Sequence, residues 1–317
     1  MKKRHQLTQS EVIDHMPLAC SDELTAVEFM ENQRWGDTPG CVHCGSVEVY
    51  KMMGKTGQRN ARFLWRCRGC GKQFTVRIGT IYEESRIPLR HWCYAFWRAA
   101  TSKKGVAALE IMRHCQISYK SALFLMNRIR FAMAPETGQE KLSGIVEVDE
   151  TYVGGKPRQA NIRKRGRGTS KTPVFAAVER QGRIRRRVIA NVTGETLKEA
   201  IQQEVSNQAC IITDDFTPYR RLGREFEGGH EVICHSTKEY VRGNIHTNTV
   251  ESSFALVKRG IMGVYHNVSK EYLHRYLWQF DFIWNNRKMN DGERTVELMK
   301  VTEGKRLMYK APLKGAS

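Results

Sequence analysis

The second half of the chain alternates between short apolar runs and longer segments with helical spacing. Polar and apolar residues alternate in residues 145–153, whereas residues 209–213 form a continuous apolar run, as in a strand buried on both faces. The pattern predicts strands at 145–153, 173–180, 184–191, 209–213 and 231–235, and helices at 195–206, 216–222, 248–259 and 270–287. Three successive strands followed by strands and helices in turn predict a mixed five-stranded sheet with helices on its faces.

The first half has short strands around two cysteine pairs, followed by three helices. Residues 1–20 are polar, and Met16-Pro17 interrupts helical spacing, so this stretch is predicted to be irregular. A helix is predicted next, with a cap at Ser21 or Asp22, an end near Arg34, and Leu24, Val27 and Phe29 on its buried side. Further strands are predicted at 47–53, at 61–67 and ending near Ile81, and helices at 88–101, 105–115 and 118–133.

These changes of pattern divide the chain into five parts. Residues 134–144 are rich in Gly, Pro and polar residues and are predicted to form a linker. The predicted parts are an N-terminal helical segment (1–36), a cysteine-rich ribbon (37–82), a three-helix domain (86–133), the mixed α/β domain (144–290) and a C-terminal tail (291–317).

The charge of the chain indicates a polyanionic partner. There are 52 Lys and Arg residues against 33 Asp and Glu residues, which gives a net charge of +19. Twelve of the basic residues lie in 156–187 beside one acid, Glu179, and thirteen lie in 51–104 beside two. General solubility would explain a modest excess of charge but leaves this clustering unexplained.

The sequence gives no sign of a membrane partner. It contains no apolar run of about 18–20 residues and no apolar core of a signal peptide near its N-terminus. The nine cysteines are therefore expected in a reducing cytoplasm, where Cys-x-x-Cys pairs indicate metal binding rather than disulfides.

Two cysteine pairs have the spacing of a structural zinc site. Cys41 and Cys44 form the first pair, Cys67 and Cys70 the second, and 22 residues separate the pairs. Four thiolates fill a tetrahedral zinc site and leave no open position for chemistry, so His43 is not needed as a ligand. Such a ribbon suits contact with DNA phosphates, although many ribbons dock other proteins.

Helices 105–115 and 118–132 have the spacing of a helix-turn-helix. In that arrangement the N-terminal residues of the second helix, Ser118, Tyr119 and Lys120, would face base edges in the major groove. A plain helical bundle has the same periodicity, so both interpretations remain.

Carboxylates lie at the ends of two short apolar runs that are predicted to be strands. Glu147 and Asp149 share one strand face, and Asp149 is the better candidate ligand because it lies nearer the strand end. Asp214 follows the buried strand 209–213 and is favoured over Asp215, which could instead cap a helix at Phe216. An isolated Asp at a strand end usually has only such a capping role.

A third acid, Glu251, begins a helix that carries Lys258 on the same face two turns later and then Arg259. An acid in the first turn also complements the helix dipole, with Asn248 or Thr249 as the N-cap, so a purely structural role for Glu251 is the alternative.

Together the three acids suit two divalent cations, Mg²⁺ or Mn²⁺. Two such ions, about 4 Å apart and bridged by Asp149, would activate a water or a DNA 3′-hydroxyl and stabilise the leaving oxygen. Lys258 could hold the DNA end beside them. In a chain this basic, the expected substrate is a nucleic-acid phosphodiester.

The chain resembles the ISXO-like, zinc-ribbon group of bacterial insertion-sequence transposases, which are named DDE for their catalytic acids and are related to eukaryotic Merlin elements. The resemblance covers residues 20–290 and is carried by RWGD…CVHCGS, WRCRGCGKQFTVRIGTIYEESRIPL, VEVDETYVGGK, TDDFTPY, HTNTVESSFALVKRGIMGVYHNVS and YLWQFDFIWNNR. It implies an RNase H-like catalytic domain whose acids are Asp149, Asp214 and Glu251, with Lys258 downstream.

Two details of the chain stand out within that family. The third acid is Glu, where relatives often have Asn or His, and CVHC replaces the common Cys-Pro-x-Cys. The first detail favours metal binding at Glu251. The second leaves the zinc ligands in place and affects only the turn between them.

The resemblance and the chemistry together predict an enzyme that binds the terminal inverted repeats of its own element, cleaves the ends and joins the 3′-hydroxyls to target DNA. It is expected to act as a homo-oligomer on double-stranded DNA in the bacterial cytoplasm, with one structural zinc ion. The residues expected to contact DNA are Ser118, Tyr119, Lys120, Arg163, Lys164, Arg165, Arg167, Lys258 and Arg259. The alternatives are a non-catalytic DNA-binding regulator and an RNase H-like nuclease without strand transfer.

Overall fold

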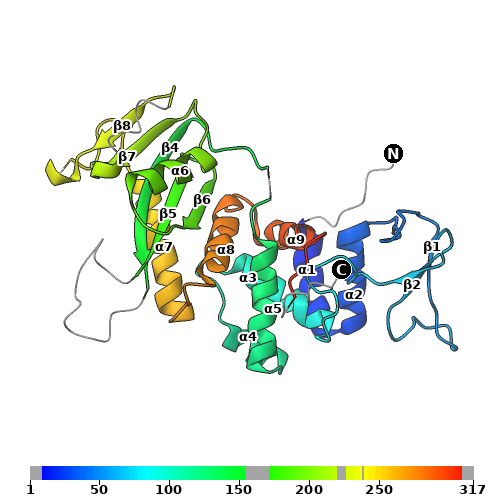
Figure 1. Cartoon of the computed structure of the whole chain (residues 1–317). Helices are drawn as coiled ribbons and strands as arrows, with labels where there is room; N and C mark the ends of the chain where they lie inside the picture. The colour runs from blue at the N-terminus through cyan, green and yellow to red at the C-terminus, as the bar shows by residue number, and fades with distance from the viewer. Residues whose placement is uncertain (1–8, 137, 155–170, 220–225, 238, 309–317) are drawn as a thin grey trace, which may run out of the picture. The chain divides into compact units, whose positions relative to one another are not determined.

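The computed structural model describes residues 9–136, 138–154, 171–219, 226–237 and 239–308 (Figure 1). Internal contacts divide the chain into two units. The first unit comprises residues 1–102, 106–133 and 288–317, and the second comprises residues 103–105 and 134–287. None of the described helices is long and apolar enough to cross a membrane.

The first unit contains helices and a small antiparallel sheet in the order β1-β2-β3. Its elements are α1 (Gln9–Ser21), α2 (Glu23–Trp35), β1 (Val49–Lys51), β2 (Trp65–Cys67), β3 (Gln73–Phe74), α3 (Leu89–Thr101), α4 (Ala108–Cys115), α5 (Tyr119–Ala132) and α9 (Asp291–Lys300). The third ribbon strand thus ends at Phe74, earlier than the predicted end near Ile81.

Helix α1 corrects the prediction of an irregular N-terminal stretch. It includes Pro17, which removes one backbone N–H and costs about 3 kcal/mol within a helix. Val12, Met16 and Ala19 recur at helical spacing and are buried in the first unit. We infer that the burial of this face outweighs the local effect of the proline.

Helix α2 begins at the predicted cap. The Asp22 carboxylate accepts a hydrogen bond from the Thr25 backbone N–H at 2.7 Å, and Gly36 ends the helix with a positive φ of 61°. Val27 and Phe29 are buried as predicted, but Leu24 is 41% exposed. Leu24 lies in the first turn of the helix, three residues before Val27.

The ribbon packs on α2 through aromatic rings and one buried ion pair. Trp35 makes edge-to-face contacts with Trp65 and Phe74, at 5.9 and 5.7 Å between ring centroids. The Glu31 carboxylate accepts hydrogen bonds from the Arg59 guanidinium and, at 2.7 Å, from the Trp65 indole. These contacts join the ribbon to the helices without a large apolar core.

Helix α9 was not predicted from the apolar pattern. Asn290 and Glu293 form a capping box, in which each side chain accepts the other residue's backbone N–H. The helix buries Val296, Leu298 and Met299 in the first unit. The capping box is visible in the sequence, whereas the weak apolar spacing of DGERTVELMK conceals the helix.

Helices α4 and α5 are separated by residues 116–118, as the helix-turn-helix spacing predicts. Gln116 adopts a left-handed conformation with φ 53° and ends α4, and the Ser118 hydroxyl caps α5 by accepting from the Ser121 N–H. Helix α5 buries Ala122, Leu125 and Met126. Its N-terminal residues 118–120 are exposed.

The second unit is built on a five-stranded sheet in the order β6-β5-β4-β7-β8. Its elements are β4 (Ile145–Val153), β5 (Thr172–Glu179), β6 (Ile184–Val188), α6 (Gly194–Glu204), β7 (Cys210–Asp214), β8 (His230–Ile233), η3 (His235–Thr237), α7 (Asn248–Gly260), the π-helix η4 (Ile261–Tyr265) and α8 (Leu273–Asn285). Residues 217–219 form one helical turn of the predicted helix 216–222, whose remainder lies outside the described residues.

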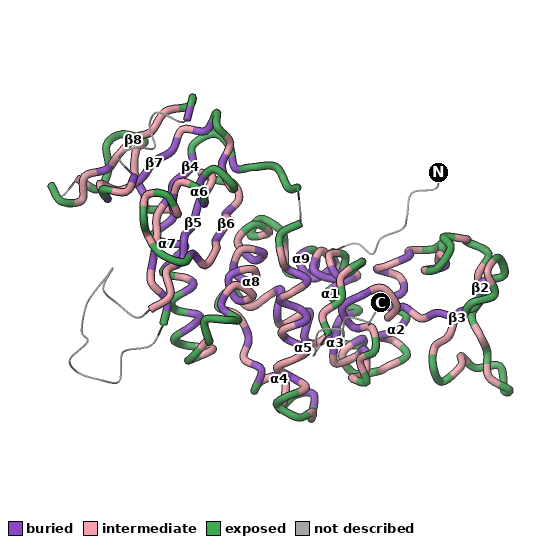
Figure 2. Tube along the Cα trace, in the orientation of Figure 1, coloured by how far each residue is buried: buried purple, intermediate pink, exposed green. Residues whose placement is uncertain are grey.

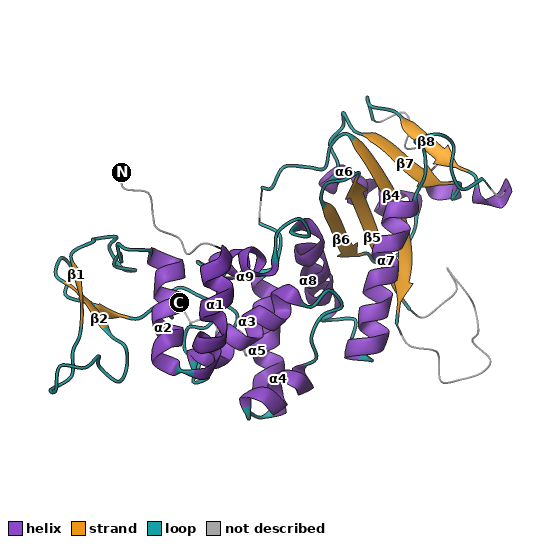
Figure 3. Ribbon diagram, turned by 180° about the vertical axis from the view of Figure 1, so that it is seen from behind, coloured by secondary structure: helices purple, strands orange, loops and turns teal. Residues whose placement is uncertain are grey.

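Strand directions confirm a mixed, RNase H-like sheet. Strand β4 pairs parallel with β7 and β7 parallel with β8, whereas β5 runs antiparallel to both β4 and β6. One face packs on α6 through residues such as Val146, Val148 and Leu197, and the other packs on α7 and α8 (Figures 1 and 3). Buried residues follow β4 and β5 along their length, so the central strands are covered on both faces (Figure 2).

We predict that Glu31→Ala destabilises the first unit by about 3–5 kcal/mol, because it leaves the Arg59 guanidinium buried without its partner. Urea unfolding followed by tryptophan fluorescence measures the change, since Trp65 lies in this contact. The matched control is Glu28→Ala, at an exposed position on the same helix, which should change stability by no more than about 0.5 kcal/mol. Equal effects of the two substitutions would contradict the role of the buried pair.

Candidate metal centres and nucleic-acid interface

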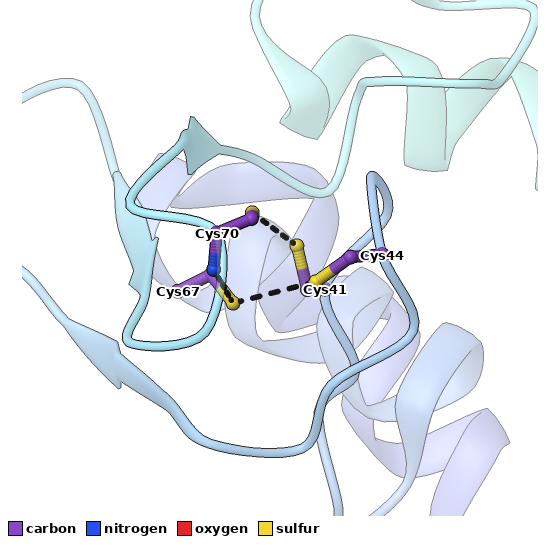
Figure 4. Close-up of side chains that lie close together, drawn as sticks. All are labelled: Cys41, Cys44, Cys67 and Cys70. Atoms are coloured by element: carbon purple, nitrogen blue, oxygen red, sulfur yellow. Dashed lines mark hydrogen bonds between the residues drawn. The ribbon is translucent and has the colours of Figure 1, made fainter.

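The four predicted zinc ligands converge on one point. Cys41 and Cys44 lie on one loop of the ribbon and Cys67 and Cys70 on the other, with their sulfurs directed toward one another (Figure 4). The four sulfurs lie within 4.8 Å of one another, with 3.7 Å between the Cys41 and Cys70 sulfurs and between those of Cys44 and Cys67. A tetrahedral zinc site with bonds of about 2.3 Å requires sulfur separations of about 3.8 Å.

The loop backbones direct N–H groups at these sulfurs. The His43 N–H lies 3.4 Å from the Cys41 sulfur, and the Cys70 N–H lies 3.4 Å from the Cys67 sulfur. The second contact lowers the pKa of Cys67 to about 7, which favours the thiolate that metals bind. The His43 ring contacts the Gln73 carbonyl oxygen instead of the cluster. The ribbon is therefore the site of a structural zinc ion.

Glycine is required in both loops. Gly45 and Gly71 each follow a cysteine pair with positive φ, at 74° and 71°, and their N–H groups return to the carbonyl oxygens of Cys41 and Cys67. A side chain would meet no neighbour at either position, so the left-handed backbone is what favours glycine there.

Sheet register brings the first two candidate acids together. In the parallel pair β4 and β7, Val146 lies opposite Ile211 and Glu147 opposite Ile212. The paired residues end there, and continuing the same register by two residues leads from Glu147 to Asp149 and from Ile212 to Asp214. Adjacent strands are about 4.8 Å apart, so this continuation brings the two carboxylates close together where β7 ends beside the middle of β4. The charge of Asp214 accordingly acts on Asp149.

The charge state of Asp149 reflects this crowding. Burial raises its pKa well above 3.8, and the nearby charges of Glu150, Asp214 and Glu251 raise it further. All three candidate acids, from β4, β7 and α7, therefore share one electrostatic environment.

The structure reverses the expected roles of the two neighbouring aspartates toward Phe216. The Asp214 carboxylate, rather than that of Asp215, accepts the Phe216 backbone N–H at 3.2 Å. Asp215 instead accepts a hydrogen bond from the Ser236 hydroxyl at 2.6 Å, which lowers its pKa. In the sequence, Asp214 and Asp215 are both close enough to Phe216 to bond its backbone N–H. The direction of β7 decides which of the two carboxylates makes this bond.

Glu251 lies in the first turn of α7 with its side chain half exposed. Its carboxylate accepts a hydrogen bond from the Thr247 hydroxyl at 2.9 Å and lies 3.5 Å from the His235 ring. Thr247 is the N-cap residue, so the predicted caps Asn248 and Thr249 are wrong by one or two positions. Neither His235 nor Thr247 is singled out by the sequence analysis, and the polar run HTNT (246–249) hints at Thr247 alone.

The backbone of the first turn of α7 is capped by a different acid. Glu147 accepts the backbone N–H groups of Thr249 and Val250, at 2.8 and 3.0 Å. These two N–H groups of the first turn are thus bonded from β4 and not by Glu251. The Glu251 carboxylate remains directed at a hydroxyl and an imidazole.

The donor set of the three acids suits hard divalent cations, since carboxylate oxygens are the ligands of Mg²⁺ and Mn²⁺. Among the described residues, only the four cysteines bring three or more candidate ligand atoms within 4.8 Å of one another. The three acids do not meet this distance criterion.

The described residues predicted to contact DNA are exposed. Ser118, Tyr119 and Lys120 lie at the N-terminus of α5, and Lys258 and Arg259 lie in the last turns of α7. Arg163, Lys164, Arg165 and Arg167 lie outside the described residues.

Comparison with known proteins gives concordant matches. Residues 141–285 match the family model of the ISXO2-like transposase domain, and residues 21–73 match that of the transposase zinc-ribbon domain. A Halobacterium salinarum protein described as an uncharacterized protein in transposable element ISH50 is 28% identical over 271 residues, which cover 81% of this chain and 89% of that protein. A chain of a pre-cleavage Mos1 transpososome aligns over 95% of this chain and 98% of its own length at 13% identity, with a TM-score of 0.25 that is too low to support an argument.

We predict that Cys67→Ser removes zinc from the protein and unfolds the ribbon, because three thiolates no longer close the site. Metal analysis of the purified protein measures the zinc content. Cys210→Ser, at a half-buried position in the second unit, should retain one zinc per chain. Full zinc content in Cys67→Ser would contradict the four-cysteine assignment.

We predict that Asp149→Asn stabilises the Mg²⁺-free protein at pH 7. Because the pKa of Asp149 is higher in the folded than in the unfolded chain, the wild-type protein loses stability as the pH rises through that interval. The melting temperature of the variant should therefore exceed that of wild type at pH 7, and the difference should shrink as the pH falls toward 4. Asp215→Asn should have the opposite sign, since the pKa of Asp215 is lowered. A pH-independent difference for Asp149→Asn would refute this assignment.

Proposed function

Because the chain belongs to the ISXO2-like transposases, we propose that it binds the terminal inverted repeats of its insertion sequence, cleaves the element ends and joins their 3′-hydroxyls to target DNA. Cleavage would be a hydrolysis and joining a transesterification. Both reactions displace an oxygen from a DNA phosphate at one metal-dependent site.

One observation carries the proposal. Acids from β4, β7 and α7 gather at one end of the sheet, although their mutual repulsion disfavours such an arrangement. A cluster of this kind is costly for folding alone and is explained if cations are bound there.

Each residue has a role that follows from its position. Asp149, Asp214 and Glu251 would hold the two ions, and the exposed Lys258, seven residues after Glu251 on α7, would bind a phosphate of the DNA end. When bound, two Mg²⁺ or Mn²⁺ ions would supply an activated water or hydroxyl and stabilise the leaving oxygen.

The first unit would grip the DNA. Exposed residues at the start of α5 suit the major groove, and the basic ribbon suits the phosphate backbone. We further propose that the chain acts as a homo-oligomer that pairs two ends, and that residues 37–82, 86–133 and 144–290 are its ribbon, helix-turn-helix and catalytic domains. Further phosphate contacts would come from five basic residues: Arg163, Lys164, Arg165, Arg167 and Arg259.

Two other functions remain as alternatives. A domesticated DNA-binding regulator would need the first unit alone and gives no reason for the cluster of acids. An RNase H-like nuclease would use the same acids without joining ends. Supplying element-end DNA together with a target plasmid separates the latter from a transposase, because a nuclease yields no joined product.

We predict that Glu251→Gln reduces DNA cleavage by about 10³-fold while end binding stays at the wild-type level, because one metal ligand loses its charge. Nicking of labelled end DNA and gel-shift binding measure the two activities. Asp215→Asn is the matched control: it removes an acid adjacent to the site that contacts Ser236, and should leave cleavage within a few-fold of wild type. Wild-type cleavage by Glu251→Gln would exclude the proposed role.

We predict that Lys120→Ala weakens binding to element ends and reduces the slope of the logarithm of affinity against the logarithm of salt concentration by about 1, because the variant removes one positive charge from the interface. Lys300→Ala, an exposed lysine in the last turn of α9 in the same unit, serves as the control and should leave the slope unchanged. Fluorescence anisotropy at several salt concentrations measures both. An unchanged affinity in Lys120→Ala would remove α5 from the interface.

A further inference from the structure

Glu147 is a buried acid that accepts hydrogen bonds at both carboxylate oxygens. Its side chain is fully buried, and every donor around it comes from the second unit. Carboxylate oxygen Oε2 accepts the backbone N–H groups of Thr249 and Val250, and Oε1 accepts the Thr249 hydroxyl at 2.8 Å. On the other side, the Arg180 guanidinium donates to Oε1 at 2.9 Å.

These contacts remove Glu147 from the set of metal ligands. Both oxygens are already occupied by donors, and the side chain has no exposed surface through which an ion could approach. Two residues further along β4, Asp149 is less completely buried than Glu147 and lies among other acids. Two acids on one strand face therefore have different roles.

The carboxylate joins the two elements that carry the site. It lies on β4 two residues before Asp149, and it bonds the N–H groups of the two residues that immediately precede Glu251 on α7. A carboxylate at a helix N-terminus bonds otherwise unpaired N–H groups and complements the helix dipole. Because two N–H groups of α7 bond the same carboxylate, this contact fixes the position of the first turn of α7 along its axis and its rotation about that axis, relative to β4.

The segment before α7 is held by the same group. Arg180, next to the end of β5, donates to the carbonyl oxygens of Asn244 and His246, and the His246 ring lies 3.3 Å from Glu147. Buried charge is thereby paired and hydrogen-bonded, which is the condition for tolerating it. The network links β4, β5 and residues 244–250 around one carboxylate.

We propose that Glu147 is a positioning residue for the reaction: by anchoring the N-terminus of α7 on β4, it sets the position of Glu251 relative to Asp149. This inference rests on the proposed function in so far as Glu251 acts in cleavage. The anchor itself is independent of activity and is measurable without DNA. Glu147 acts through α7 and touches neither substrate nor metal.

The test compares Glu147→Gln with Glu179→Gln in the full-length protein. Glu179, at the end of β5, also bonds an arginine and a backbone N–H, but it holds Ser143 and Arg183 rather than α7. Hydrogen exchange of the Thr249 and Val250 amides reports the anchor. Single-turnover cleavage of end DNA, the Mg²⁺ concentration for half-maximal rate, end binding and melting temperature report its consequence.

In Glu147→Gln, we expect faster exchange at Thr249 and Val250, cleavage reduced by roughly 10- to 100-fold, and a higher Mg²⁺ requirement, with end binding unchanged. A purely structural role would lower the melting temperature and leave the Mg²⁺ requirement at the wild-type value. If the variant does not fold, Thr249→Val, which removes only the hydroxyl donor to Oε1, should show the same Mg²⁺ shift to a smaller degree.

Wild-type cleavage and Mg²⁺ dependence in a folded Glu147→Gln, or an equal change in Glu179→Gln, would overturn the positioning role. Absence of cleavage by the wild-type protein would instead refute the proposed function. In that case the exchange rates at Thr249 and Val250 still decide whether the anchor exists.

Discussion

Three carboxylates repel one another, and the second unit must hold them in place against that repulsion. The pKa of Asp149 is raised by burial and by the charges of its neighbours, which shows that the arrangement opposes ionisation in the metal-free chain. The sheet register pairs Glu147 with Ile212, two residues before Asp149 and Asp214, and the two apolar layers that cover β4 and β5 hold the strands in this register. Glu147 then ties the third acid to this frame through α7.

In the first unit, the ribbon segment needs stabilising contacts other than an apolar core of its own. The ribbon has strands of only two or three residues. Four sulfurs around a zinc ion, an aromatic cluster with Trp35 and the buried Glu31 supply the contacts that the strands cannot. The N-terminus of α5 lies exposed in the same unit, whereas Ala122, Leu125 and Met126 of that helix are buried.

Much of this arrangement could be predicted from local sequence. The cysteine spacing identifies the zinc ligands because two Cys-x-x-Cys pairs supply the four thiolates that one tetrahedral zinc ion requires. The alternation in 145–153 and the continuous apolar run before Asp214 identified β4 and β7, since strand periodicity is a local property. The Ser118 cap of α5 likewise depends on neighbours within one helical turn.

The features that the sequence does not predict depend on contacts between residues that are distant in the chain. Pro17 disfavours a helix locally, and α1 forms because one face of the helix is buried against the rest of the unit. The sequence showed that Glu147 and Asp149 share a face, but not that the N-terminus of α7 lies over Glu147. His235 and Thr247 reach Glu251 only after β8 and α7 are assembled.

We propose that Asp149, Asp214 and Glu251 bind divalent cations. Anomalous diffraction from crystals of the protein soaked in Mn²⁺ would reveal these ions. Manganese peaks are expected within coordinating distance of all three carboxylates and none at Glu147, with zinc at the four cysteines. Manganese absent from these carboxylates at saturating concentration, or bound at Glu147 instead, would contradict this proposal.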